Sequence, residues 1–98
     1  MSVSATEQGN TVTIKVTGRF DFSAHQEFIA AYRDIPKGEK DFVVDLSGTE
    51  YMDSSAMGML LQLREHASKS GQVSLANANA NIQEILKIAN FDKLFNVS

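Results

Sequence analysis

Apolar and polar residues alternate near the start of the chain, which is the pattern of a strand with one buried face. In Thr11–Gly18, valine and isoleucine occupy every second position between threonines and a lysine. The shorter segment Val3–Thr6 can pair with it across the turn-prone residues 7–10. The two segments together predict an antiparallel hairpin.

A helical spacing of apolar residues follows the hairpin. Ser23 and Gln26 fit the capping box, in which a serine caps the helix and a glutamine three residues later bonds back to it. We expect this helix to run to about Asp34, with Pro36 preventing its continuation.

The middle of the chain holds an almost wholly apolar run, Phe42–Leu46, as expected for a central strand covered on both faces. A short polar loop should follow, and then a helix from Ser54 to about Ser68 that ends at Gly71. The apolar stripe assigned to this helix contains Met57, Leu60, Leu61 and Ala67, with Arg64 as a polar exception.

The last third of the chain predicts one more strand and two more helical segments. Val73 and Leu75 lie on one face of the strand Gln72–Ala76, a helix covers residues 82–89, and Phe91–Phe95 forms a short closing helix or turn. Strands that alternate with helices indicate an α/β fold with right-handed crossovers. We expect one domain over residues 1–98, with a four- to five-stranded, mixed but mostly parallel sheet and three to four helices.

Composition narrows the possible functions. The 98 residues include no cysteine, which excludes disulfides and thiolate metal sites. The first ten residues lack the pattern of a signal peptide, and no apolar run approaches the length of a membrane span. The net charge is −3 and the basic residues are scattered, so a nucleic-acid surface is not expected. We expect a cytoplasmic protein without a cofactor that binds neither nucleic acid nor membranes.

The junction Asp53-Ser54-Ser55 places an acid and two hydroxyls where the central strand gives way to a helix. All three are good N-caps, so a purely structural role is one interpretation. A serine at a helix N-terminus also faces free N–H groups and the positive end of the helix dipole, where a phosphate is well accommodated. Phosphorylation is the second interpretation, and the residues alone leave both open.

An enzyme is not expected, because the parts of one are missing. The sequence has no G-x-S-x-G nucleophile elbow and no Gly-rich nucleotide loop. His25 and His66 lie on different predicted helices without a carboxylate at ligand spacing, which favours structural roles. Met52 and Met57 flank the junction as core residues or as partner contacts. Arg19, Asp21 and Phe22 follow the second strand and could lie near the junction.

The segment VVDLSGTEYMDSSAMGMLL resembles the signature of STAS domains, in particular bacterial anti-sigma factor antagonists. The resemblance extends over nearly the whole chain and includes the late segment Ile88–Phe95. The segment Gly18–Phe28 also resembles small stand-alone members linked to motility and biofilm control. One departure is Ala56, which stands where the family usually has glycine.

The resemblance implies a partner-switching module with no catalysis of its own. Its partner is an anti-sigma factor that is also a serine kinase, which binds the unphosphorylated antagonist and so frees the sigma factor. Ser54 matches the family's phosphoacceptor, with Ser55 as second choice, and a metal-dependent serine phosphatase reverses the modification. The residues expected to contact the partner are Asp53, Ser54, Ser55, Met57, Met52 and Arg19. The alternatives are a STAS adaptor subunit of a transport or lipid-trafficking complex, and a scaffold subunit of a sensory assembly.

Overall fold

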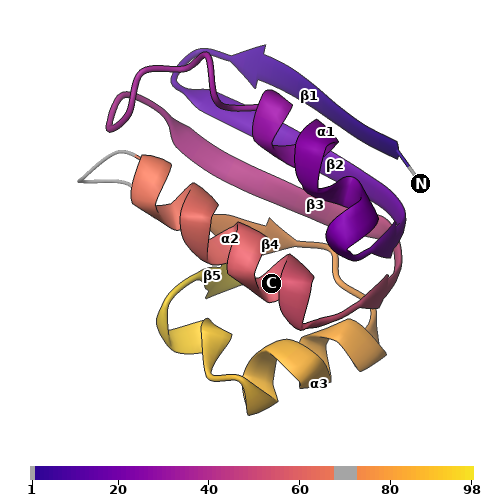
Figure 1. Cartoon of the computed structure of the whole chain (residues 1–98). Helices are drawn as coiled ribbons and strands as arrows, with labels where there is room; N and C mark the ends of the chain where they lie inside the picture. Colours follow the sequence, from indigo (N-terminus) through magenta and orange to yellow (C-terminus); the bar gives the residue numbers. More distant parts are fainter. Residues whose placement is uncertain (1, 68–72) are drawn as a thin grey trace.

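The computed structural model describes residues 2–67 and 73–98 and contains one five-stranded sheet with the order β1-β2-β3-β4-β5 (Figure 1). The strands are β1 (Ser2–Gln8), β2 (Thr11–Phe20), β3 (Asp41–Met52), β4 (Ser74–Ala76) and β5 (Asn96–Val97). β1 pairs with β2 antiparallel, and the other neighbours pair in parallel. The predicted α/β fold with a mixed, mostly parallel sheet is therefore confirmed.

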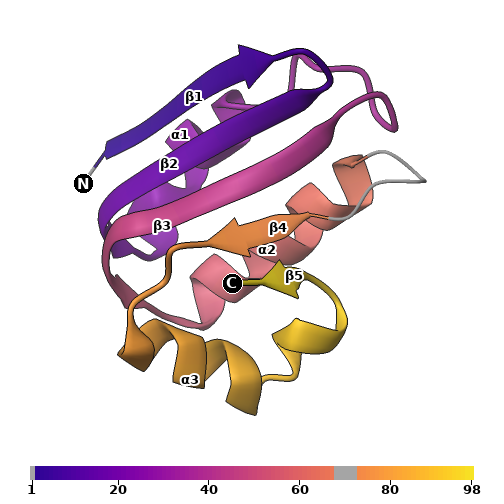
Figure 2. The ribbon, with the colours of Figure 1, turned by 180° about the vertical axis from the view of Figure 1, so that it is seen from behind.

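In the described residues three α-helices accompany the sheet: α1 (His25–Ala30), α2 (Ser54–His66) and α3 (Ala80–Ile88). Two short 3₁₀ helices, η1 (Phe22–Ala24) and η2 (Phe91–Lys93), precede α1 and follow α3. Figures 1 and 2 show α1 and α2 on one face of the sheet, whereas α3 lies beyond its β4–β5 side. None of the described helices covers the opposite face of β2 and β3 (Figure 2).

The core lies between this sheet and the layer of α1 and α2. Alternate residues of β2 and β3 point into it and are buried, namely Val12, Ile14, Val16, Phe42, Val44 and Leu46. The residues between them in β3 are not: Val43 and Asp45 are half-buried and Ser47 is exposed. The prediction that this strand is covered on both faces was therefore wrong. Val43 is apolar although it does not point into the core, so the sequence does not reveal the alternation of buried and accessible positions.

β3 is longer than the apolar run that predicts it. The expected polar loop before α2 is instead strand, because pairing with β2 continues as far as Phe20 opposite Met52. The buried Thr49 hydroxyl supports this extension by donating to the carbonyl of Val16 at 2.7 Å. Two register shifts interrupt the ladder, and Gly48 permits the close approach there, since a Cβ at this position would lie 3.1 Å from the Thr17 hydroxyl oxygen.

The first helix differs from its prediction at both ends. Ser23 does not cap it: the Asp21 carboxylate caps η1 by accepting the Ser23 N–H at 3.0 Å, and α1 begins only at His25. The α-helix ends at Ala30 and continues as turns to Asp34. An aspartate two residues earlier provides the same capping chemistry as the predicted serine, so the pattern misplaced the start.

The later elements agree better with the sequence. The third helix and the short closing helix are confirmed as α3 and η2, whereas the two-residue strand β5 was not predicted. The proposed end of α2 at Ser68 and Gly71 and the first residue of the strand from Gln72 lie outside the described residues. Within the described ranges, no helix combines the length and apolar character that crossing a membrane requires.

Candidate functional site

The candidate site is built around the start of α2. Asp53 is the N-cap: its backbone is extended and its carboxylate accepts the N–H of Ala56 at 3.1 Å. Ser54 is the first helical residue and is exposed, whereas Ser55 is half-buried. The predicted position of Ser54 within one turn of the helix N-terminus is confirmed. Of the two serines, Ser54 is the more accessible.

The end of β2 lies directly beside this helix start. The Asp53 N–H donates to the carbonyl of Phe20 at 3.4 Å, which joins the residue after β3 to the last residue of β2. Residues following Phe20 therefore lie next to the Ser54 turn, as the sequence suggested. This arrangement follows from the parallel pairing of β2 with β3, which brings both carboxyl ends to the same edge of the sheet.

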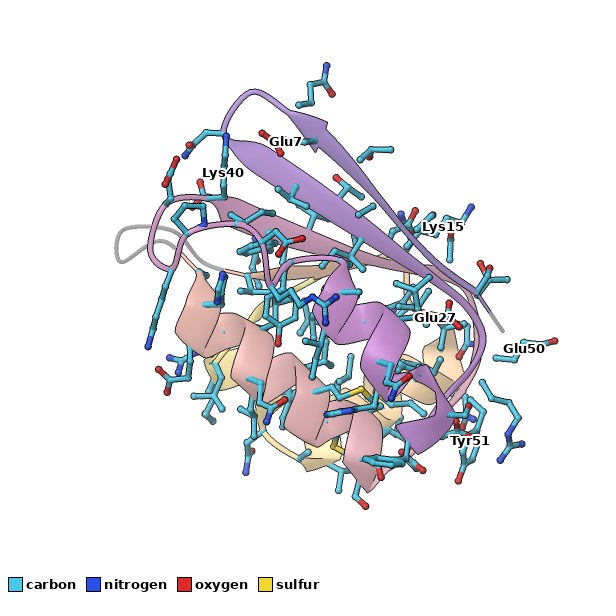
Figure 3. All side chains as sticks on the ribbon, turned by 45° about the horizontal axis from the view of Figure 1, so that its top comes forward. Glu7, Lys15, Glu27, Lys40, Glu50 and Tyr51 are labelled. Carbon is cyan, nitrogen blue, oxygen red and sulfur yellow. The ribbon has the colours of Figure 1, made fainter. Side chains whose placement is uncertain are left out.

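Arg19 links the ends of both strands. Its guanidinium lies over the ring of Tyr51, 4.2 Å from the centroid, and its Nε is 3.4 Å from the Asp21 carboxylate. The side-chain hydrogen bond from Ser23 and the nearby arginine keep the pKa of Asp21 below its usual value. Figure 3 shows Tyr51 at the end of the molecule opposite Glu7 and Lys40. Arg19 is thus held at the same end as Ser54.

One predicted contact residue is in the wrong place. Met52 is only 3% exposed and belongs to the core, so the prediction that it contacts a partner was wrong. Its side chain is buried because β3 extends to this residue, and the two register shifts together return Met52 to the alternation of Phe42, Val44 and Leu46. Met57 is half-buried against the core and keeps part of its surface accessible.

The structure adds exposed apolar residues that sequence reasoning did not include in the site. Phe22 is 68% exposed, with its ring stacked on His25, and Tyr51 and Leu61 are also exposed. Phe22 follows β2 at the same end of the sheet, and Leu61 lies two turns into α2. The sequence assigned Leu61 to the buried stripe, but the residues that α2 buries are Ala56, Met59, Leu60 and Leu63. The sequence carries only a weak signal for which side of the helix is buried, because residues 57–63 are almost all apolar.

Two small residues of α2 have opposite environments. Ala56 is fully buried, so its methyl group packs inside the protein and does not face a partner. Gly58 is exposed, and a Cβ placed on it would meet no atom within 4 Å. Because Ser54 and Gly58 are four residues apart, they share one face of the helix. The accessible surface beside Ser54 therefore includes a stretch of bare helix backbone.

Comparison with known proteins assigns the chain to a family. The sequence model described as "Mlab, STAS domain" matches residues 3–96. The chain belongs to the STAS-domain family. It is also 48% identical over 91 residues to a STAS-domain containing protein of Pseudomonas aeruginosa (strain UCBPP-PA14), a match that covers 92% of this chain and 90% of that protein.

Two solved STAS structures are similar in fold. The anti-sigma factor antagonist SpoIIAA, in its unphosphorylated form, has a TM-score of 0.67 and 19% identity, covering 89% of this chain and 83% of that one. An anti-sigma factor antagonist from Mycobacterium paratuberculosis has a TM-score of 0.81 and 18% identity, covering 98% of this chain and 83% of that one. The STAS resemblance seen in the sequence is confirmed.

Proposed function

We propose that this protein is an anti-sigma factor antagonist whose unphosphorylated form binds an anti-sigma factor of the serine-kinase type and so frees a sigma factor. Phosphorylation of Ser54 blocks this binding. The observation that carries the proposal is an exposed serine in the first turn of α2, beside the ends of two central strands. The names of the two structural neighbours support the class of partner.

The environment of Ser54 suits a phosphate. Free N–H groups and the positive end of the helix dipole favour an anion at this position. A phosphate adds about −1.5 to −2 charges beside the carboxylate of Asp53, which makes this end of the helix strongly negative. The fold should tolerate the change, because a charge pair at about 4 Å in open solvent is worth only about 1 kcal/mol.

Exclusion from the interface explains the switch better than a change of fold. Shifting a partner from 99% to 1% bound requires about 5.5 kcal/mol. Burying an uncompensated charge in an interface costs several kcal/mol per ion, which is the size required. Ser54 therefore acts from within the partner footprint.

The rest of the footprint follows from the exposed residues beside Ser54. Phe22 and Tyr51 provide aromatic surface, Arg19 provides a charged group stacked on an aromatic ring, and Leu61 and Met57 extend the apolar area along α2. Aromatic residues and arginine are the types that dominate binding energy at protein interfaces. We assign direct contact to these residues, together with Asp53 and Ser55, and not to Met52.

In this proposal the protein acts in the cytoplasm and catalyses no reaction itself. The anti-sigma factor supplies the kinase activity, and a metal-dependent serine phosphatase removes the phosphate. Motility or biofilm control is the process that the segment Gly18–Phe28 suggests. Which sigma factor is released depends on the identity of the partner.

A kinase assay tests the proposal. The cognate anti-sigma factor should phosphorylate the wild type and the Ser55→Ala variant at similar rates, and should fail to phosphorylate Ser54→Ala. Intact-mass spectrometry of the protein from its host should show a phosphate whose amount changes with growth conditions. Normal phosphorylation of Ser54→Ala would contradict the assignment.

The adaptor and scaffold functions predict different partners. A pull-down with the unphosphorylated protein should recover a kinase-type anti-sigma factor. Recovery of membrane transporter subunits would instead favour a transport or lipid-trafficking adaptor, and recovery of other STAS proteins would favour a sensory scaffold.

A further inference from the structure

The two edges of the sheet differ. β5 ends one side with only two residues, whereas β1 ends the other with seven, and β1 pairs with β2 from Ser2 to Gln8 without a register shift (Figure 2). No described strand pairs with the outer edge of β1. Such an edge exposes a row of unpaired N–H and C=O groups, which proteins normally protect with proline, bulges or charges.

β1 has almost none of these protective features. Its sequence, SVSATEQ, contains no proline and one charged residue, Glu7. Glu7 lies 3.1 Å from the Nζ of Lys40, which partly neutralises it, and both side chains lie together at one end of the strand (Figure 3). The segment from Ser2 to Thr6 is therefore an uncharged edge without a bulge.

The hairpin turn determines which backbone groups face outward. The turn contains only Gly9 and Asn10, so Gln8 and Thr11 form the closing pair and exchange both hydrogen bonds. Hydrogen-bonded and non-bonded pairs alternate along an antiparallel ladder. The N–H and C=O groups of Val3, Ala5 and Glu7 consequently point away from β2 and are free to pair with another strand.

A second copy of β1 complements this edge. In an antiparallel pair centred on Ala5, the residue opposite Ala5 is the other copy's alanine, and Val3 lies opposite the other copy's Glu7. On the uncovered face, Ser4 lies opposite Thr6, and hydroxyl pairs of this kind are favourable cross-strand neighbours. The two Glu7 side chains are separated by about 14 Å along the strands, which is beyond the Debye length at physiological salt.

We propose that two copies of this protein associate through antiparallel pairing of their β1 edges, forming one continuous sheet across the dimer. The Ser54 surface lies at the carboxyl ends of β2 and β3, so it stays accessible in each copy. Strand pairing buries little side-chain surface, so the dimer should be weak and concentration-dependent.

Sedimentation velocity from about 10 μM to about 1 mM tests the pairing. The wild type should shift from 10.7 kDa towards twice that mass. The double variants Ser4→Lys/Thr6→Lys and Ser4→Glu/Thr6→Glu each place like charges opposite one another and should dimerise at least tenfold more weakly. An equimolar mixture of the two should associate again. The matched control Gln62→Lys/Asn81→Lys changes two exposed helical positions and should behave like the wild type.

Amide hydrogen exchange of the wild type gives a second readout that needs no variant. The N–H groups of Val3, Ala5 and Glu7 should exchange more slowly at high than at low protein concentration, while those of Ser4 and Thr6 should not change. A wild type that remains monomeric up to 1 mM, a dimer that both charged variants form equally well, or concentration-independent exchange at these three amides would each overturn the proposal.

Discussion

One carboxylate oxygen of Asp53 accepts the backbone N–H of Ala56 at 3.1 Å, so the residue before Ser54 caps α2. The cap and the proposed phosphoacceptor are therefore different side chains. Ser54 can be modified without loss of the cap, which leaves its hydroxyl free for a regulatory role.

Replacement of the cap should affect stability more than replacement of the phosphoacceptor. Asp53→Ala removes the bond to Ala56 and should reduce the free energy of unfolding by about 1 kcal/mol. Asp53→Asn keeps a capping oxygen and is the matched control, with a much smaller loss. Ser54→Ala should change stability by less than about 0.5 kcal/mol. Urea denaturation of the three variants checks this order, and a larger loss in Ser54→Ala than in Asp53→Ala would show that Ser54 has a structural role.

Gly58→Ala should separate stability from binding. Alanine is the better helix former and meets no atom at this position, so the free energy of unfolding should rise by about 0.5–1 kcal/mol. The added methyl group should nevertheless weaken binding of the anti-sigma factor, because Gly58 lies four residues from Ser54 on the same face. Asn81→Ala, at an exposed position of α3, serves as the control and should leave the affinity unchanged. Tighter or equal binding by Gly58→Ala would place this face outside the footprint.

Phe22 should contribute to binding and little to folding. The ring is 68% exposed, so Phe22→Ala should leave the melting temperature nearly unchanged, while the affinity for the anti-sigma factor falls at least tenfold, or about 1.4 kcal/mol. Ile88→Ala is the matched control, because Ile88 is 76% exposed on α3. Calorimetric titration of each variant with the anti-sigma factor measures the two affinities. Equal affinities for the two variants would exclude Phe22 from the interface.

Protonation of Asp45 should lower the free energy of unfolding in acid. Partial burial alone would raise its pKa, but the Ser47 N–H and the Asn77 side chain outweigh it and hold the pKa below 3.8. The unfolded chain therefore binds the proton more readily, so this contribution is complete above the unfolded pKa and is lost as pH falls below 3.8. Asp45→Asn should be less stable than the wild type at neutral pH, and the difference should narrow below about pH 4 in denaturation measured from pH 7 to pH 3. A gap that stays constant over this range would contradict the assignment to Asp45.

Much of the fold was predictable because alternation and helical spacing are strong signals in β2 and α3. The position of the candidate site in the fold was predictable for a similar reason, since a capping sequence after an apolar strand indicates the carboxyl end of the sheet. The inward direction of Thr49 was not predictable: Leu46, Thr49 and Met52 are buried at intervals of three, and only the shifted register between β2 and β3 explains this spacing. β5 was missed because a two-residue strand forms only through its pairing with β4.

The most direct test of the account compares the affinity of Ser54→Asp and Ser54→Ala for the cognate anti-sigma factor by titration calorimetry, with melting curves of both. Aspartate at this position favours the helix N-terminus, so Ser54→Asp should be at least as stable as Ser54→Ala. It also places a second carboxylate beside Asp53, so its affinity should be at least tenfold lower. Equal affinities would place Ser54 outside the interface and contradict the exclusion mechanism, and a large loss of stability in Ser54→Asp would show that charge acts through the fold.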